Sequence, residues 1–250
     1  MATDRRQTIT VDSLSKRYGD IQAVDDLSFT VYAGQIVGFL GPNGAGKTTT
    51  MKILTGAIAA SSGSATVAGH DVRRQRNAVR QKIGYLPEDV PLYDQMLLWD
   101  YLRFIADLRR IPSEEREARI HDVAKQTGLT PMLGRSIDEL SKGYRQRVGL
   151  AQAIIHDPPV IILDEPTTGL DPNQIVDIRD VITTIGEEQT VILSTHILQE
   201  VSAVCDRIII IDAGRLVADG TLDELRTQHP HDDPSLEAIF RYFTTEYSHA

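Results

Sequence analysis

A short glycine-rich stretch, GPNGAGKTT, carries the clearest chemistry in the sequence. Its spacing matches the pattern G-x-x-x-x-G-K-[ST], in which backbone N–H groups surround phosphates, a lysine reaches the terminal ones and a hydroxyl can ligate Mg²⁺. An apolar run, QIVGFL, precedes it, and a helix is expected from Lys47 to about Ala57, which is the strand–loop–helix context that the pattern requires. A chance glycine turn is the alternative. The residues expected to contact a bound nucleotide are Gly41, Pro42, Asn43, Gly44, Ala45, Gly46, Lys47, Thr48 and Thr49.

Two adjacent carboxylates, Asp164 and Glu165, follow the apolar run VIIL. An aspartate at the end of a buried strand can complete a Mg²⁺ shell to which Thr48 also contributes. The glutamate after it can polarise a water, because an oxygen nucleophile that attacks phosphorus must lose a proton. Capping of the next helix is the alternative role for this pair.

A second candidate anion site lies in the stretch ELSKGYRQRVGL, where a Ser-Lys-Gly turn leads directly into a predicted helix. The first N–H groups of a helix lack intrahelical partners, and the helix dipole is positive there. Ser141 and Gly143 are therefore candidates for contact with a phosphate. The turn alone does not say whose phosphate it binds.

The elements that must position these residues follow from hydrophobic periodicity. Alternating apolar residues in QTITVDSL and DLSFTVY predict half-buried antiparallel strands, and SATVAG and Ile83 to Leu86 predict shorter ones. After Pro158 the runs VIILD, TVILS and RIIIID alternate with helical segments, one of which is capped by Asp171 with Pro172 in its first turn. Such alternation predicts an α/β fold with a mostly parallel sheet covered by helices.

A helical insert is expected from about residue 88 to 153. In LLWDYLRFIADL one face carries Leu98, Tyr101, Leu102, Ile105 and Leu108, and the next helix, EEREARIHDVAKQTG, is expected to start at a Ser113 cap and stop at Gly128. Residues 1–225 are taken as one domain, and Thr221 with Glu224 predicts a capping box near its end. Residues 226–250 form a tail whose short amphipathic helix carries Leu236, Ile239, Phe240 and Phe243.

Bulk composition sets further expectations. The chain has 250 residues, 41% of them hydrophobic, and a net charge of −9, so we expect no nucleic-acid partner and take RRQR as a solvated face. Cys205 is the only cysteine, so we expect a buried structural thiol and a reducing compartment. No secretory signal follows the N-terminal MATDRRQTIT, and no apolar run approaches the roughly 20 residues that cross a bilayer, so another chain would have to span a membrane.

Four motifs, GPNGAGKTTT, LSKGYRQR, ILDEPTTGLDP and LSTH, occur in an order and spacing that resemble the nucleotide-binding subunit of an ABC transporter. The resemblance covers nearly the whole chain. It implies a P-loop NTPase with a RecA-like core, an N-terminal antiparallel β subdomain and an inserted helical subdomain, acting as an ATPase on ATP with Mg²⁺. It also implies a head-to-tail dimer, in which the turn from Ser141 to Tyr144 binds the γ-phosphate of ATP held by the other chain.

The resemblance also assigns roles to single residues. It implies that Tyr18 stacks on adenine, that His196 contacts the γ-phosphate, and that Asp171 lies on a loop crossing the dimer interface. Lys47, Glu165 and His196 are then the catalytic residues. A core tyrosine and a satisfied buried histidine are the alternatives for Tyr18 and His196.

Two positions depart from the usual family pattern. Glu88, in IGYLPEDVPLY, stands where the family usually has glutamine; its carboxylate can approach Mg²⁺ or a bound water but cannot donate as an amide does. The expected metal contacts are thus Thr48, Asp164 and Glu88. Lys142 and Tyr144 stand where many relatives have glycine and glutamine.

Within the family, IGYLPEDVPLYDQMLLWDYLRFIA, LSKGYRQRVGLAQA and SLEAIF look most similar to the ABC-2 export-type ATPases, such as those of gliding motility, multidrug export and copper-enzyme maturation. This implies a chain on the cytoplasmic face of the membrane that drives a multi-span permease, with Leu92, Tyr93 and Tyr101 as a partner surface unless they are packed core. The alternative is a soluble ABC ATPase of translation or DNA repair; such proteins usually carry two cassettes or a long coiled-coil insert. A regulatory module without turnover is disfavoured by Lys47, Asp164, Glu165 and His196. We expect the second ATP-binding subunit to be another copy of this chain, a homodimer, with a heterodimer as the alternative; the cargo and the identity of the membrane partner stay open.

Overall fold

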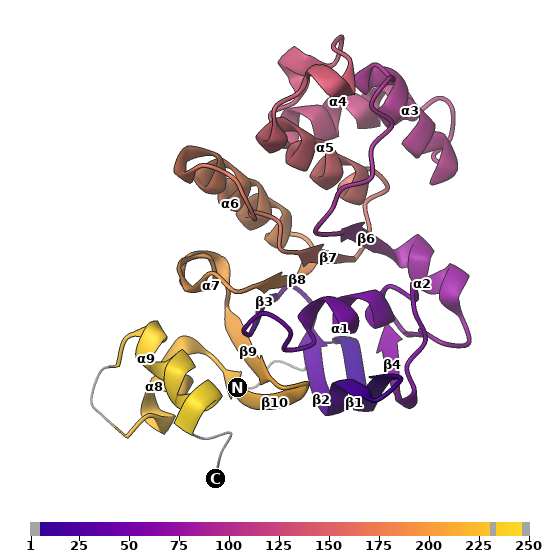
Figure 1. Ribbon diagram of the computed structural model, residues 1–250. Coiled ribbons are helices and arrows are strands. Elements are labelled where there is room, and N and C mark those ends of the chain that lie inside the picture. Colours follow the sequence, from indigo (N-terminus) through magenta and orange to yellow (C-terminus); the bar gives the residue numbers. More distant parts are fainter. Residues whose placement is uncertain (1–5, 231–233, 247–250) are drawn as a thin grey trace.

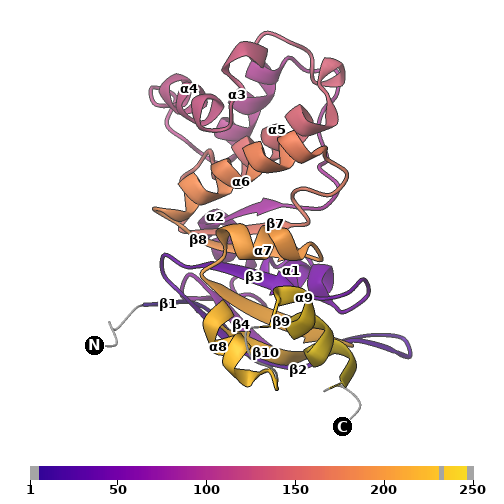
Figure 2. The same ribbon diagram turned by 90° about the vertical axis from the view of Figure 1, so that its left-hand side faces the viewer.

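The computed structural model describes residues 6–230 and 234–246. Two β-sheets form the lower part, and a block of helices made of α3, α4 and α5 lies above them (Figure 1). Seen from the side, the layers run from this block through α6 to the strands, with α8, α9 and the first sheet at the base (Figure 2). The structure confirms the predicted α/β class with an antiparallel sheet and inserted helices.

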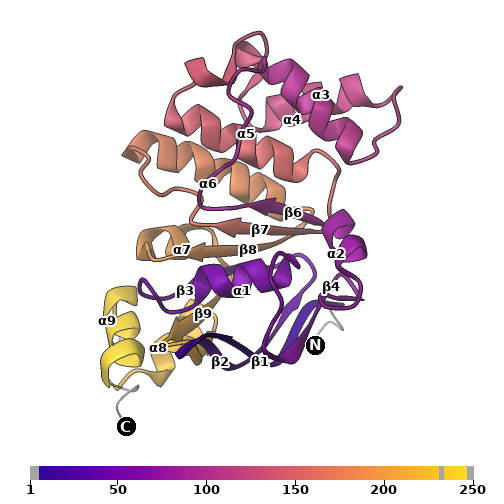
Figure 3. The ribbon, with the colours of Figure 1, turned by 45° about the vertical axis from the view of Figure 1, so that its right-hand side comes forward.

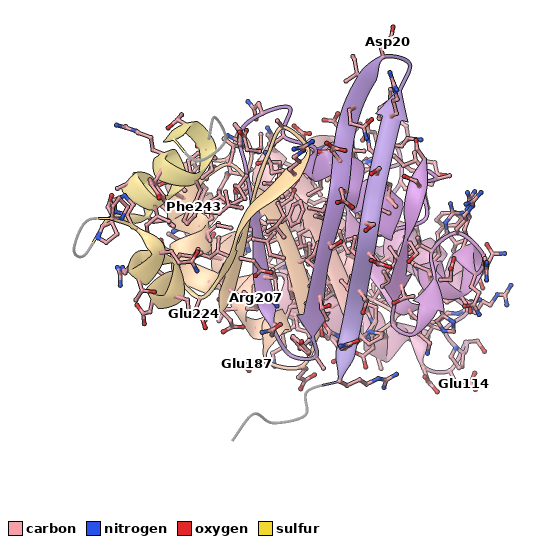
Figure 4. All side chains as sticks on the ribbon, turned by 90° about the horizontal axis from the view of Figure 1, so that it is seen from below. Asp20, Glu114, Glu187, Arg207, Glu224 and Phe243 are labelled. Atoms are coloured by element: carbon pink, nitrogen blue, oxygen red, sulfur yellow. The ribbon has the colours of Figure 1, made fainter. Side chains whose placement is uncertain are left out.

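The first sheet is antiparallel and has the order β2-β1-β4-β5. Its strands are β1 (Gln7–Tyr18), β2 (Ile21–Tyr32), β4 (Ser62–Val67) and β5 (His70–Asp71). Alternate side chains such as Ile9, Val11 and Phe29 are buried, as the sequence pattern predicts. Figure 4 shows this sheet from below, with Asp20 at the tip of the hairpin between β1 and β2.

The second sheet has the order β10-β9-β3-β8-β7-β6 and is parallel except for β10, which pairs antiparallel with β9. Its central strands β3, β7 and β8 consist of buried residues only, because helices cover both faces. The bounds are β3 (Ile36–Leu40), β6 (Ile83–Leu86), β7 (Val160–Asp164), β8 (Thr190–Thr195), β9 (Arg207–Asp212) and β10 (Arg215–Gly220).

Four helices lie against the sheets: α1 (Lys47–Leu54), α2 (Arg76–Lys82), α6 (Pro172–Gly186) and α7 (Leu198–Val204). α1 ends before the predicted Ala57, because Gly56 adopts a left-handed φ of +66° that stops the helix. The predicted cap of α6 is confirmed. The Asp171 carboxylate accepts hydrogen bonds from the N–H groups of Asn173 at 3.1 Å and Gln174 at 3.0 Å.

The insert contains α3 (Leu98–Leu108), α4 (Arg116–Gln126) and α5 (Lys142–Ile154), with 3₁₀ turns at Thr130–Met132 and Ile137–Glu139. The predicted apolar face of α3 is buried except at Leu108, which is 65% exposed. At about 100° per residue, Leu108 lies roughly 80° from Leu98, at the edge of that face. Tyr101 is buried, so its assignment to a partner surface is wrong.

The predicted Ser113 cap of α4 is also wrong. The Ser113 hydroxyl donates to the Glu114 carboxylate at 3.0 Å, and Glu115 stands at the cap position without a side-chain hydrogen bond. A turn closed by the Glu115 N–H on the Pro112 carbonyl, at 3.0 Å, delays the helix. The stop is as predicted, because Gly128 has a left-handed φ of +68° just beyond the helix end.

The C-terminal part packs on the edge of the second sheet. Helix α8 (Leu222–Gln228) starts with the predicted capping box of Thr221 and Glu224. Helix α9 (Leu236–Arg241) and the π-helical turn Tyr242–Glu246 bury Leu236, Ile239 and Phe243 against a cluster that includes Leu40, Val201 and Ile208, while Phe240 is partly buried. Burial raises the pKa of the nearby Cys205 thiol, which forms no disulfide. None of the helices in the described residues has the length and apolar content to cross a bilayer.

His156 lies at the junction between the insert and the sheet. Its Nε2 is 3.0 Å from the Ile83 carbonyl oxygen, and its Nδ1 is buried with no hydrogen-bond partner among the described residues. Burial, with the nearby Arg109 charge, lowers the pKa of His156 from 6.5 to about 4. The imidazole is therefore neutral in the folded protein, with Nε2–H as the donor.

We expect this histidine to contribute to acid sensitivity. The stability that the neutral imidazole contributes is fully present above pH 6.5 and is lost as the pH falls towards about 4. In this window the unfolded chain binds a proton at His156 and the folded chain does not, which favours unfolding. The variant His156→Gln keeps a donor for the Ile83 carbonyl but cannot titrate. Urea unfolding across this pH window should show a smaller loss of unfolding free energy in the variant than in the wild type. Parallel pH curves would contradict the assignment.

Candidate nucleotide-binding site

The glycine-rich loop from Gly41 to Thr48 joins β3 to α1 and borders a cavity of about 490 Å³. The cap position of α1, Gly46, forms no side-chain hydrogen bond, so the first amides of the helix face the cavity without a side-chain cap. Such an arrangement binds anions. The cavity is lined by Ala23, Asn43, Gly44, Gly46, Lys47, Thr48, Thr49, Glu88, Glu165, Thr168 and His196.

Main-chain contacts hold the loop in shape. The N–H of Gly214, in the turn between β9 and β10, donates to the Ala45 carbonyl at 3.1 Å, and the Asp25 N–H donates to the Gly214 carbonyl at 2.8 Å. Gly46 has a φ of +101°, and a Cβ there would lie 2.4 Å from the Ala23 carbonyl oxygen. Gly44 also has a left-handed φ, +82°, but a Cβ there would meet no atom within 4 Å.

Asp164, at the end of β7, fits a Mg²⁺ site. Its Oδ1 accepts hydrogen bonds from the hydroxyls of Thr48, at 3.2 Å, and Ser194, while its buried Oδ2 has no partner among the described residues. Burial raises the pKa of the Asp164 carboxyl, and a cation would compensate for that burial. The described residues contain no group of three or more His, Cys, Asp or Glu side chains that could hold a metal. One carboxylate and one hydroxyl leave the remaining positions to water and phosphate, as Mg²⁺ commonly requires.

Glu165 lies between a cation and an imidazole. Its Oε1 is 3.3 Å from Lys47 Nζ, and its Oε2 is 2.8 Å from His196 Nδ1. Lys47 is 6% exposed and also donates to the carbonyls of Gly41 at 2.8 Å and Pro42 at 3.2 Å. The backbone of Glu165 has a φ of +51°, which turns its carboxylate away from the strand direction. A left-handed glutamate is a strained conformation of the kind that occurs at functional sites.

Comparisons with known proteins agree with this geometry. A profile of the family described as ABC transporter matches residues 24–168. NatA of Bacillus subtilis (strain 168), an ABC transporter ATP-binding protein, is 38% identical over 231 residues, which are 90% of this chain and 94% of NatA. This chain belongs to the ABC transporter family of ATP-binding proteins.

Further comparisons agree with this family assignment. The daunorubicin resistance ATP-binding protein DrrA3 of Streptomyces coeruleorubidus is 38% identical over 88% of this chain and 70% of its own length. A solved structure described as the ATP binding subunit of an ABC transporter has a TM-score of 0.86 and 31% identity, covering 94% of this chain and 99% of that one. The chain spans from 42% to 94% of the length of the first curated relatives that it matches.

The site of this ABC chain contains a buried acid that the sequence analysis missed. Glu200 on α7 is buried and accepts hydrogen bonds from the hydroxyls of Thr167 and of Thr195, the latter at 2.8 Å. Burial raises the pKa of the Glu200 carboxyl. Glu200 thereby joins the loop after Glu165 to the end of β8, directly before His196. One sequence signal could have identified Glu200: it is an acid four residues after His196, within an otherwise amphipathic helix.

Other predicted nucleotide contacts lie outside the cavity. Tyr18 ends β1 and is 47% exposed, with Lys16 Nζ 4.9 Å from its ring centroid, so it is not a core residue and its stacking on adenine stays a prediction. Ser141 caps α5, where its hydroxyl accepts from the Tyr144 N–H at 3.4 Å. Gly143 packs against Gln174 on α6. In the described residues, Ser141, Gly143 and Asp171 do not line the cavity beside Lys47.

The two loop glycines provide a matched test. Gly46→Ala combines backbone strain with a contact on the Ala23 carbonyl, whereas Gly44→Ala introduces strain alone. We expect Gly46→Ala to lose ATP binding by tenfold or more, about 1.4 kcal/mol, and Gly44→Ala to lose less. Titration with a fluorescent ATP analogue measures both affinities, and the circular dichroism spectrum checks folding. Equal losses would show that the Ala23 contact does not shape the loop.

Proposed function

We propose that this chain hydrolyses ATP with Mg²⁺ as one half of a head-to-tail dimer, and that the hydrolysis drives a separate multi-span membrane subunit of an exporter. The observation that carries the proposal is the separation of two sites on one chain. Lys47, Glu165 and His196 converge on one cavity, whereas Ser141 stands at a helix start outside it. A second chain can bring its own Ser141 to this cavity.

Each residue of the cavity has a distinct task in this proposal. The loop amides and Lys47 bind the phosphates, while Thr48 and Asp164 would hold Mg²⁺, which neutralises phosphate charge. Since Lys47 Nζ contacts Glu165, a terminal phosphate that attracts the ammonium frees the Glu165 carboxylate for a water. Glu165 then polarises this water as general base, and His196 orients the carboxylate through its Nδ1 and faces the γ-phosphate.

The proposed contact with the membrane subunit is an exposed aromatic face. Tyr93 is 59% exposed and packs edge-on against Phe104, which is 41% exposed, at 5.6 Å between ring centroids. Leu97 is also exposed, whereas Leu92 is partly buried. We define Tyr93, Leu97 and Phe104 as the aromatic face. It follows Glu88, which lines the phosphate cavity, so nucleotide contact at Glu88 can displace the face that the partner occupies.

This proposal places the chain as a peripheral subunit on the cytoplasmic face of the membrane. The names of two relatives, the ABC transporter ATP-binding protein NatA and the daunorubicin resistance ATP-binding protein DrrA3, support transport over a soluble role in translation or DNA repair. Two experiments test the mechanism and the coupling separately.

Mixed dimers test the arrangement in trans. Chains with Lys47→Ala and chains with Ser141→Arg should be inactive alone, but each mixed dimer contains one intact site. An equal mixture, with the membrane subunit present, should recover up to about a quarter of wild-type ATP turnover if the two sites act independently.

The matched control mixes Lys47→Ala with Glu165→Gln. Both residues of a given site come from the same chain, so no mixed dimer contains an intact site. This control should recover nothing, since loss of a general base costs about 10² to 10⁴ in rate. Recovery in both mixtures, or in neither despite mixed dimers, contradicts the sandwich.

Crosslinking tests the aromatic face. In a chain with Cys205→Ser, a cysteine at Leu97 should form a disulfide with a cysteine in a cytoplasmic segment of the membrane subunit. The yield should change when ATP binds, because the insert shifts relative to the cavity. A cysteine at Glu237 on α9 serves as the control position. Crosslinks at Glu237 alone would place the coupling site elsewhere.

A further inference from the structure

A strongly basic surface covers α2 and the turn before it. The chain has a net charge of −9, yet residues 72–82, VRRQRNAVRQK, contain five basic residues and no acid. All five are exposed, and only Val72 and Val79 of this segment are buried. The basic residues are Arg73, Arg74, Arg76, Arg80 and Lys82.

Neighbouring acids neutralise these charges only in part: the pKa of Asp71 is lowered by a backbone hydrogen bond from Arg74 and also by the charges of Arg74 and Arg73. Among the described residues, none of the five lies within 4.0 Å of a carboxylate as an ion pair. Asp71 is adjacent, but its Oδ1 accepts from the backbone N–H groups of Arg73 and Arg74, each at 2.8 Å. Arg80 donates a hydrogen bond to the Gly56 carbonyl at 2.9 Å. A carbonyl carries no net charge, so this contact does not neutralise the guanidinium.

The surface continues onto the end of α3. Arg109 Nη1 donates to the Arg80 carbonyl at 2.7 Å, and Arg110 beyond it is exposed. Leu108, 65% exposed, and Phe104 lie on the same helix, next to the charges. Figures 1 and 3 both place α3 above α2 at the right-hand edge, and Figure 4 shows nitrogen-tipped side chains gathered over the α2 segment. We name Arg73, Arg74, Arg76, Arg80, Lys82 and Arg110 the basic surface.

We propose that the basic surface rests on the anionic phospholipid head groups of the membrane, with Leu108 at the lipid–water interface. The inference rests on the proposed function, since it requires a chain that works beside a bilayer. Guanidinium groups pair well with phosphate, and basic side chains flanked by exposed apolar ones are typical of surfaces that lie on anionic membranes. Each basic side chain near such a surface raises affinity by roughly fivefold.

The remainder of the chain supports one orientation. Because the basic surface is positive while the whole chain is negative, the other faces are more acidic than the average. An anionic membrane therefore attracts this face and repels the others, which orients the chain as it approaches. The aromatic face lies beside the basic surface because α3 connects them. Phe104 of the aromatic face is on α3, and Arg110 of the basic surface follows its last residue. Lipid contact would thus turn the aromatic face towards the membrane subunit.

Vesicle binding of the full chain tests this inference. Vesicles of phosphatidylcholine alone are compared with vesicles that also contain phosphatidylglycerol, with and without added salt. The test variant carries Arg73→Gln, Arg74→Gln and Arg76→Gln. The control carries Lys125→Gln, Arg135→Gln and Arg241→Gln, which remove the same charge from exposed positions elsewhere. We expect salt-sensitive binding to the anionic vesicles alone, about a hundredfold weaker in the test variant and little changed in the control.

Several results would overturn the inference: equal binding to both vesicle types, equal losses in both variants, or unchanged binding in the test variant. If the test variant binds vesicles normally but no longer copurifies with the membrane subunit, the surface takes an acidic protein segment instead. ATP turnover and mixed-dimer recovery are measured on the same variants. If the wild-type chain turns over ATP normally but does not bind anionic vesicles, the inference about the basic surface is rejected alone. If the wild-type chain binds the vesicles but shows no turnover, the proposed function is rejected alone.

Discussion

The contact between Lys47 and Glu165 is the interaction on which the site depends, because it joins side chains from two strands that are not neighbours in the sheet. Lys47 follows β3 and Glu165 follows β7, with β8 between them. His196 follows β8 and contacts the same carboxylate. The carboxyl ends of parallel strands meet at one edge of a sheet, so strand order alone brings the three side chains together. The charges of Lys47 and Glu165 are largely buried, and each would be costly there without the other.

The surrounding polar groups keep this contact in place. Asp164 is fixed by two hydroxyls, and Glu200 ties Thr167 to Thr195 on either side of the Glu165 and His196 pair. Buried hydrogen-bond networks of this kind make the arrangement of side chains specific. The strained backbone of Glu165 is held by the same network, because β7 and β8 fix the residues before and beside it.

The parts of the fold that local chemistry decides could be predicted from the sequence. Asp171 followed by proline, Thr221 with Glu224, and Gly128 specify helix ends through their own backbone bonds. Two predictions were wrong because they depended on tertiary structure. A turn at Pro112 prevents Ser113 from capping α4, and Leu108 lies at the edge of the buried face of α3. Sequence motifs indicated Lys47, Asp164, Glu165 and His196. The role of Glu200 could be recognised only from the structure, in which its carboxylate accepts hydrogen bonds from two separate segments. The residues of RRQR are exposed, as the sequence predicted, and the role proposed for them depends on the position of α3, which only the structure shows.

The phosphate-binding loop is bounded by main-chain atoms of β2 and of the turn at Gly214, in addition to the hydrogen bonds that Lys47 donates within the loop. Main-chain carbonyls and amides are present whatever residue occupies the position. The side chains of Ala23 and Asp25 can therefore be exchanged without removing these main-chain contacts, so long as the strand and the turn persist. An engineer could therefore vary the side chains on the strand and the turn beside the loop and leave its main-chain supports in place.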